Sequence, residues 1–425
     1  MSAEWEKLTQ EAENLYNAGN CDQAIRVAKK ALEGAQKNLG PNHPDVANSL
    51  YNLAYLYYNQ GKYAQAEPLY ERAFAIYENA LGPEHPDVAM SLYNLATLYS
   101  QQGKYAQAEP LFNRATAIYE KTLGPDHPDV ASSLHNLALL DFYQGKYAQA
   151  ELLFKRALTI RVNALGSNHP YVAMSLFNLA TLYTNQGQYE QAEPLYKHAL
   201  AIYENALGPD HPDVAECLYN LANLYHKQGQ YAQAEPLYKR ALEIEENALG
   251  PDHPSVAEWL SNLANLYSDQ GQYTQAEPLF KGALAIQEVA LSPNHPDVAN
   301  SLYNLANLYS QQGQYAQAEP LYKRAIAIWE NSLGPDHLDV ANSLNRLADL
   351  YYNQDQYEQA EPLFKRSLAI YEDALRPDHP KVIASLKNLA ILYRKIGLIK
   401  KAEALEDKMA ASHPSGYSQE SEKTK

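Results

Sequence analysis

The sequence has 425 residues, with 34 Lys and Arg against 50 Asp and Glu, so its formal net charge is −16. This acidic balance argues against a protein that binds a nucleic-acid backbone, which would show a basic stripe. The N-terminal residues 1–7 lack the apolar segment of a signal peptide, and no stretch approaches about 18 uncharged apolar residues. We therefore expect a cytoplasmic protein that binds neither nucleic acid nor membrane.

One sequence pattern recurs along the whole chain, and its most visible mark is a histidine that proline usually follows. His85 comes 42 residues after His43, and the same interval separates all the later copies. The nine copies are His43, His85, His127, His169, His211, His253, His295, His337 and His379. A period of this length indicates a solenoid, in which each unit buries its apolar face only against its neighbours. Function is then expected on a long shared surface rather than in a catalytic pocket.

Each unit predicts two helices, as residues 45–86 show. Apolar residues spaced by three and four run to Gln60, and a second such stripe runs from Tyr63 to Tyr77. Gly61 separates the two stripes, and Gly82-Pro83 ends the second one. We call the two predicted elements helix A and helix B. Pro68 is expected in the first turn of helix B, where a missing N–H costs little.

Ten helix pairs are predicted over residues 1–411, with repeats starting near residues 3, 45, 87, 129, 171, 213, 255, 297, 339 and 381. Residues 412–425 carry Ser, Pro, Gly and charge without periodicity, and they are predicted to form a disordered tail. The outer faces of the first and last helices are polar, which favours a monomer. Cys21 and Cys217 lie five repeats apart, too far for a disulfide, and are expected to be free thiols in a reducing compartment.

The spacing of small and aromatic residues resembles that of the tetratricopeptide repeat. The matching residues are Leu53, Ala54, Tyr57, Gly61, Tyr63, Ala66, Tyr70 and Ala73. The 42-residue version is similar to the repeats of kinesin light chains and of many bacterial and cyanobacterial arrays. The resemblance covers residues 3–411 and implies an all-α, right-handed superhelical solenoid of about ten helix-turn-helix repeats.

The same resemblance implies a binding groove lined by helix A, in which an asparagine hydrogen-bonds the backbone of an extended peptide. We call the corresponding residues the asparagine ladder: Asn52, Asn94, Asn136, Asn178, Asn220, Asn262, Asn304 and Asn388. Arg346 stands in the ladder position of the ninth repeat. The alternative is that each asparagine bonds the neighbouring repeat and only stiffens the stack, and the two interpretations are compatible.

Two further sets of residues extend the expected groove. Tyr51, Tyr93, Tyr219 and Tyr303 precede ladder residues and are expected to form an exposed aromatic patch, the alternative being drift on a solvated face. Arg346, Lys387 and Arg394 make the last repeats basic, which predicts docking of an acidic ligand segment there. A second tyrosine row, which begins with Tyr63, is expected in the interior.

No catalytic residue, metal site or cofactor is predicted. The linker histidines lie a repeat apart, too far to share a metal ion, and a role as helix caps is expected instead. The sequence also lacks nucleotide-binding and hydrolase motifs. The predicted function is therefore a non-enzymatic scaffold or adaptor for a protein or peptide ligand. The alternatives are a regulatory or sensor module for a separately encoded enzyme, and a self-assembling structural array.

The fourth repeat, residues 129–170, departs most from the pattern. Asp141 occupies the position of Tyr57, Tyr99 and Tyr183 in other repeats. A carboxylate in a packed position costs several kcal/mol unless it finds a partner or reaches water. We therefore expect a rotated or frayed end of helix A in this repeat, and locally weak structure.

Overall fold

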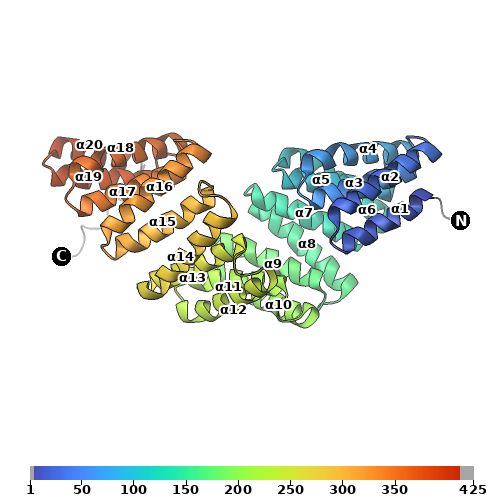
Figure 1. The fold of residues 1–425 in the computed structure, drawn as a ribbon, viewed down its shortest axis with the longest axis horizontal. Coiled ribbons are helices and arrows are strands. Elements are labelled where there is room, and N and C mark those ends of the chain that lie inside the picture. The colour runs from blue at the N-terminus through green and yellow to red at the C-terminus, as the bar shows by residue number, and fades with distance from the viewer. Residues whose placement is uncertain (1–3, 412–425) are drawn as a thin grey trace, which may run out of the picture. The chain divides into compact units, whose positions relative to one another are not determined.

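The computed structural model describes residues 4–411, which form twenty helices and no strand. The all-α class and the ten helix pairs predicted from the sequence are confirmed for these residues (Figure 1). The predicted disordered tail, residues 412–425, lies outside the described residues. None of the described helices is both long enough and apolar enough to cross a bilayer. The chain divides into two compact units, residues 1–217 and 218–425, with the boundary inside one helix, α11.

The A helices carry odd numbers and the B helices even numbers. The A helices are α1 (Glu4–Asn17), α3 (Pro44–Asn59), α5 (Pro86–Gln101), α7 (Pro128–Tyr143), α9 (Pro170–Asn185), α11 (Pro212–Lys227), α13 (Pro254–Asp269), α15 (Pro296–Gln311), α17 (Leu338–Asn353) and α19 (Pro380–Lys395). The B helices are α2 (Cys21–Leu39), α4 (Tyr63–Leu81), α6 (Tyr105–Leu123), α8 (Tyr147–Leu165), α10 (Tyr189–Leu207), α12 (Tyr231–Leu249), α14 (Tyr273–Ala290), α16 (Tyr315–Leu333), α18 (Tyr357–Ala374) and α20 (Ile399–Ala411).

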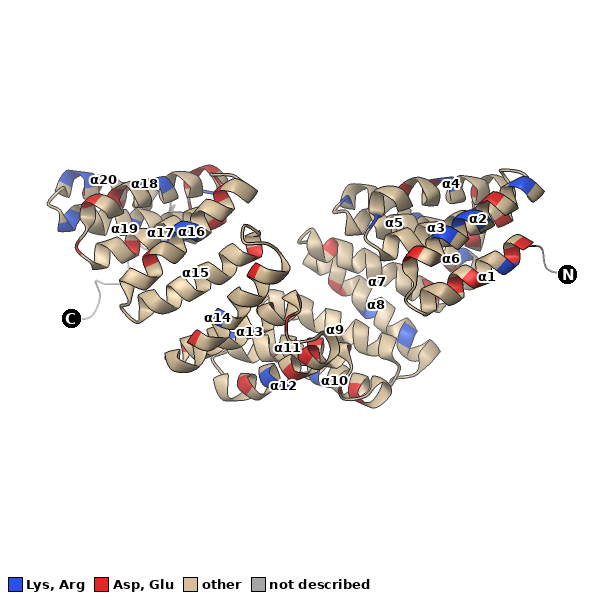
Figure 2. Cartoon of the chain, viewed as in Figure 1, with Lys and Arg blue, Asp and Glu red and all other residues tan. Residues whose placement is uncertain are grey.

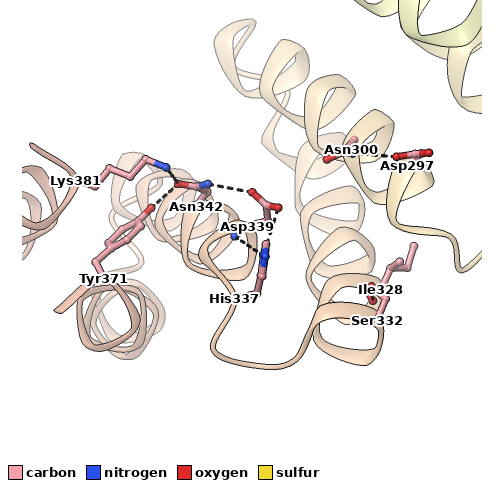
Figure 3. Close-up of polar contacts among 9 residues, drawn as sticks. All are labelled: Asp297, Asn300, Ile328, Ser332, His337, Asp339, Asn342, Tyr371 and Lys381. Atoms are coloured by element: carbon pink, nitrogen blue, oxygen red, sulfur yellow. Dashed lines mark hydrogen bonds and ion pairs between the residues drawn. The ribbon is translucent and has the colours of Figure 1, made fainter. Parts of the chain in front are cut away.

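Each linker histidine caps the helix that follows it. Nδ1 of His85 accepts a hydrogen bond of 3.2 Å from the backbone N–H of Asp87. The same bond forms at all nine histidines, and His337 shows it in Figure 3. Proline fits the next position because the first helical N–H has no partner within the helix. The predicted capping role is confirmed.

The turn between the two helices of a pair needs a left-handed residue. Gly61 has φ of +68°, and its N–H donates to the carbonyl of Tyr58 while that of Lys62 donates to the carbonyl of Tyr57. These two bonds form a Schellman motif, which satisfies carbonyls at the end of α3. Asp355 takes the glycine position in the ninth repeat with φ of +58°.

The linker after helix B also has positive φ in most repeats, and Arg376 of the ninth repeat is the exception. Gly82 has φ of +86° and ψ of +158°, a conformation that is essentially restricted to glycine. Ser292 takes this position in the seventh repeat with φ of +111°. A backbone with a Cβ is strained there. Helix α14 ends one residue earlier than α4, and α18, which precedes Arg376, does the same.

Proline in helix B lies deeper than the sequence suggested. Because α4 starts at Tyr63, Pro68 is its sixth residue and lies inside the helix, so its expected place in the first turn is wrong. At that depth an N–H would normally donate to the carbonyl four residues back, which is that of Ala64. One internal hydrogen bond is therefore missing from each B helix that has a proline at this position, namely α4, α6, α10, α12, α14, α16 and α18.

Within each unit, an A helix packs on its own B helix and that B helix packs on the next A helix. Alanines such as Ala54, Ala66 and Ala73 are fully buried and let the helices approach closely. One aromatic row of helix B is at most 2% exposed: Tyr70, Phe112, Phe154, Tyr196, Tyr238, Phe280, Tyr322 and Phe364. The row that starts at Tyr63 is only half-buried because it begins helix B at the edge of the core, so its expected interior place is wrong.

A side-chain contact joins successive repeats near the C-terminal end of helix A. The hydroxyl of Tyr267 on α13 donates to Glu235 on α12 at 2.9 Å, and Lys239 pairs with the same carboxylate at 2.8 Å. We call this contact the tyrosine–glutamate tie. It recurs between Tyr183 and Glu151, Tyr309 and Glu277, Tyr351 and Glu319, and Tyr393 and Glu361.

The fourth repeat lacks this tie, yet its helix A is intact. Asp141 is 6% exposed and lies 3.5 Å from Lys146, which also contacts Glu109 at 3.1 Å. Burial raises the pKa of Asp141, and Lys146 opposes that shift. The expected frayed end is wrong, since α7 runs to Tyr143 with the same length as the other A helices of the repeats that follow a histidine. The reason is that Lys146 supplies the partner that the carboxylate needs.

Candidate protein-binding surface

The asparagine ladder lies on the A helices, and all eight of its members are half-buried. In several repeats the amide nitrogen contacts the preceding repeat. Nδ2 of Asn136 donates to the hydroxyl of Tyr93 at 2.6 Å, and Nδ2 of Asn262 donates to that of Tyr219 at 2.5 Å. The Asn178 amide lies 3.3 Å from the ring of His135, which replaces tyrosine. These contacts reach side chains rather than the backbone of the neighbouring repeat.

The ladder amides also bond within their own helices. Nδ2 of Asn94 donates to the carbonyl of Met90 at 2.7 Å, and Asn178 and Asn262 make the equivalent bond four residues back. Within residues 4–411, the Oδ1 atoms of Asn136, Asn178 and Asn262 accept no hydrogen bond. Each of these residues therefore uses its donor for the fold and keeps an acceptor for a ligand.

The remaining ladder positions differ in the contacts that their side chains make. The side chains of Asn52, Asn304 and Asn388 make no hydrogen bond within the described part of the chain. Asn220 is half-buried on α11. At the ninth position, Arg346 lies 3.9 Å from Asp349 on the same helix.

The aromatic row beside the ladder is half-buried, so the expectation of an exposed patch is wrong. The ring of Tyr93 packs edge-on against Phe112 at 5.7 Å. Tyr219 and Tyr303 also pack edge-on against the buried aromatic row of helix B, and Tyr51 packs on Tyr70 of that row with a tilted ring. Burial raises the pKa of Tyr51, Tyr93 and Tyr219. These hydroxyls stay protonated at neutral pH, and where an asparagine donates to them they keep a hydrogen to donate.

Cavities of ligand size lie along the ladder in both units of the described chain. The cavity of the first unit is about 730 Å³ and includes Asn136 and Asn178. The second unit has one of about 620 Å³ that includes Arg346 and Asn388, which we call the second cavity, and another of about 350 Å³ that includes Asn262. These three volumes fall within the range of about 300–1,000 Å³ that is usual for ligand sites. A smaller cavity of about 260 Å³ lies beside Asn52.

Charge in the second cavity is mixed. Burial raises the pKa of Asp349 to about 6, and the nearby guanidinium of Arg346 opposes this shift. Basic residues continue along α19 and α20, where Figure 2 shows blue segments. Lys387 is exposed on α19, whereas Arg394 makes a two-bond ion pair with Glu406 on α20 at 2.8 and 2.6 Å. A ligand carboxylate would have to compete with Glu406 for Arg394.

The sequence placed His135 in the tyrosine row beside the ladder but did not single out Arg161, and both line the first cavity and are 3% exposed. The signal that could have found Arg161 is its place in the repeat, because Tyr77, Tyr119 and Tyr203 occupy the same position elsewhere. Among the described residues, no group of three or more His, Cys, Asp or Glu side chains could hold a metal ion. Cys21 and Cys217 are both free, and burial raises the pKa of the Cys217 thiol.

Stacked helix pairs with this spacing define a class of helical repeat proteins, and a family model identifies the class. The tetratricopeptide repeat model matches residues 6–79, 45–121, 101–163, 153–205, 171–247, 217–288, 255–331, 297–373 and 339–409. The chain belongs to the tetratricopeptide repeat family. Arrays of this family in general mediate interactions between proteins. No curated protein gave a significant match.

Solved structures that resemble this chain come from several organisms. The apo quorum sensor NprR from B. thuringiensis is 15% identical with a TM-score of 0.62, covering 89% of this chain and 99% of NprR. A STAND protein with a tetratricopeptide repeat sensor from Pyrococcus horikoshii is 15% identical with a TM-score of 0.61, covering 86% of this chain and 52% of that one. Kinesin light chain repeats from P. anserina are 30% identical with a TM-score of 0.42, covering 48% and 96%. The first two likenesses concern the fold alone.

Proposed function

We propose that the A-helix surface binds an extended segment of a partner protein, so that the chain acts as a scaffold or adaptor. The observation that carries this proposal is the state of the asparagine ladder. Several ladder amides hold the stack with their nitrogen and leave Oδ1 unbonded, while Asn304 and Asn388 are unbonded altogether within residues 4–411. A row of acceptors at one-repeat intervals suits the N–H groups of an extended backbone.

The ligand segment is proposed to be acidic where it meets the last repeats. Lys387 is exposed on α19 and Arg346 lines the second cavity. Exposed charges of this kind raise the association rate for an oppositely charged ligand and are screened by salt. Arg394 contributes less, because Glu406 already occupies its guanidinium.

The test begins with peptide segments selected from a random library on the immobilised full-length chain. Affinities for the double variant Asn304→Ala plus Asn388→Ala are then measured by calorimetry. Each truncation is expected to weaken binding by about 1 kcal/mol, as for one neutral hydrogen bond. Thermal stability should stay unchanged, because neither side chain bonds within the described residues. Asn331→Ala, an exposed change at the end of α16, is the matched control.

Two results would contradict the proposal. The first is an unchanged affinity in the double variant, which would assign the ladder to the fold alone. The second is selection of peptides that bind equally well after Lys387→Glu at low ionic strength, which would remove the acidic segment from the proposal. Ladder residues that also hold the stack, such as Asn262, make poorer probes, since Asn262→Ala also removes the bond to Tyr219.

A further inference from the structure

The first cavity contains a buried cation without a counter-ion. Arg161 lies near the end of α8 and is 3% exposed. Its Nη1 donates to Oγ of Ser175 at 2.6 Å and to the carbonyl of Tyr171 at 3.3 Å, and it lies 3.3 Å from Nδ1 of His135. All three partners are neutral groups. Within residues 4–411, Nη2 and Nε make no hydrogen bond and no carboxylate forms an ion pair with Arg161.

The neutral surroundings come from three departures from the repeat pattern at one place. Arg161 stands where Tyr119 stands one repeat earlier, and His135 stands where Tyr93 does. Tyr171 takes the position of an aspartate, which most other repeats carry as the second residue of helix A. The third change removes the carboxylate that the pattern would place beside the guanidinium. The Tyr171 ring lies 5.7 Å from the Arg161 guanidinium instead.

His135 does not add a second charge. Burial, and secondarily the charge of Arg161, lowers the pKa of His135 to about 3. Its Nδ1 accepts from Arg161, so the ring proton resides on Nε2. With this proton, Nε2 does not accept from the Asn178 amide nitrogen 3.3 Å away, and that nitrogen donates to the carbonyl of Met174. An isolated buried ion is strongly unfavourable. A fork of two unbonded guanidinium donors is the geometry that holds a carboxylate by two bonds.

The rest of the cavity narrows the chemistry of the ligand. Its volume is about 730 Å³, and its wall includes three acidic residues, Asp129, Asp213 and Glu216. These carboxylates disfavour a ligand that carries only negative charge, such as inorganic phosphate. A ligand with a carboxylate for Arg161 and a cationic group for the acidic wall complements both parts of the cavity.

We propose that this cavity of the first unit binds a carboxylate that is accompanied by a cationic group, with Arg161 holding the carboxylate. A free amino acid has this chemistry, and so does a peptide segment with neighbouring acidic and basic side chains. The site does not require that an extended segment occupy the asparagine ladder, so the two proposals can fail separately.

The experiment compares the full-length wild type with Arg161→Tyr, which restores the residue found one repeat earlier and one repeat later. Calorimetry and thermal unfolding are run with L-lysine, L-glutamate, glycine, inorganic phosphate and a capped Ala-Lys-Glu-Ala peptide as probes. At least one amino acid or the capped peptide is expected to bind the wild type and raise its Tm. Arg161→Tyr should weaken that binding at least tenfold and should itself unfold at a higher temperature without ligand. Binding of free amino acids or of the capped peptide alone distinguishes the two sources.

Two further variants keep the test independent of folding. Arg161→Lys retains the charge but not the two-donor fork, and should bind with intermediate affinity. Arg156 lies on the same helix as Arg161 and pairs with Glu120 at 2.6 Å. The variant Arg156→Gln removes this cation and should bind the probes like the wild type. The proposal is overturned if no probe binds, if phosphate binds as well as the amino acids, or if Arg161→Tyr binds as the wild type does.

Discussion

Replacing Asp141 with tyrosine should stabilise the fourth repeat by restoring the missing tyrosine–glutamate tie. In the wild type, two carboxylates, Asp141 and Glu109, share the single cation of Lys146. In the next repeat, the hydroxyl of Tyr183 donates to Glu151 at 2.9 Å. A tyrosine at position 141 would make the equivalent bond to Glu109 and would remove a buried carboxylate.

The magnitude follows from the bonds gained and lost. A hydrogen bond to a charged group contributes about 1.5–3 kcal/mol. The lost contact between Asp141 and Lys146 spans 3.5 Å and ends at a partly exposed lysine, so it contributes about 0–1 kcal/mol. The net gain is about 2 kcal/mol. The gain should shrink as the pH falls towards about 4, because a carboxyl group with a raised pKa binds its proton more readily in the folded state.

Hydrogen exchange is the suitable assay, because the stability of a repeat array is a sum of local and nearest-neighbour contributions. Amides of residues 137–147 are expected to exchange faster than those of residues 179–189 in the wild type, and about equally fast in Asp141→Tyr. The reverse change, Tyr183→Asp, is the control and should speed exchange in residues 179–189. The reasoning would be refuted if residues 137–147 exchanged as fast in Asp141→Tyr as they do in the wild type, or faster.

Three other changes test separate features of the fold by chemical unfolding. Ser292→Gly should raise stability by about 1–2 kcal/mol, since serine is strained at φ of +111°, and no gain would mean that the linker carries no strain. His85→Ala should cost about 1 kcal/mol through loss of the cap, whereas His85→Asn should cost little; equal losses would discount the capping bond. Asp349→Asn should be more stable than the wild type above pH 6 and lose that advantage near pH 4, because burial raises the pKa of Asp349 to about 6 and wild-type stability therefore falls as the pH rises through this range. A pH-independent difference would contradict this.

Much of the fold could be predicted because the helix ends of each repeat are determined by residues within that repeat. Glycine at Gly61 and the His-Pro step at His85 mark helix ends through backbone geometry that depends only on neighbouring residues. The depth of Pro68 could not be found in this way, because the spacing of apolar residues does not distinguish the first turn of a helix from the second. The exposure of Tyr63 and Tyr93 depends on how the next repeat packs, which the sequence of one repeat does not contain.

The candidate site could be predicted in outline only. The ladder positions follow from the register, but the division of labour within each amide, nitrogen for the stack and oxygen unbonded, depends on where the next tyrosine lies. The ion pair of Arg394 with Glu406 joins residues that are 12 positions apart in the sequence and lie on two helices, and the repeat pattern does not predict it. Arg161 was detectable as an exception to the repeat, although its lack of a counter-ion was not.

The tyrosine–glutamate tie makes the contacts between neighbouring repeats interchangeable. In each of the ties that contain Lys239 or its equivalents, a helix B offers a glutamate and the following helix A offers a tyrosine at the same height, so any such pair of neighbours fits. Removing residues 255–296 would bring Glu235 to face Tyr309 and would leave no polar group without a partner at the joint. Insertion or loss of whole 42-residue units therefore lengthens or shortens the binding surface without a new interface having to be invented, whereas a cut that is off by a few residues would separate the two partners.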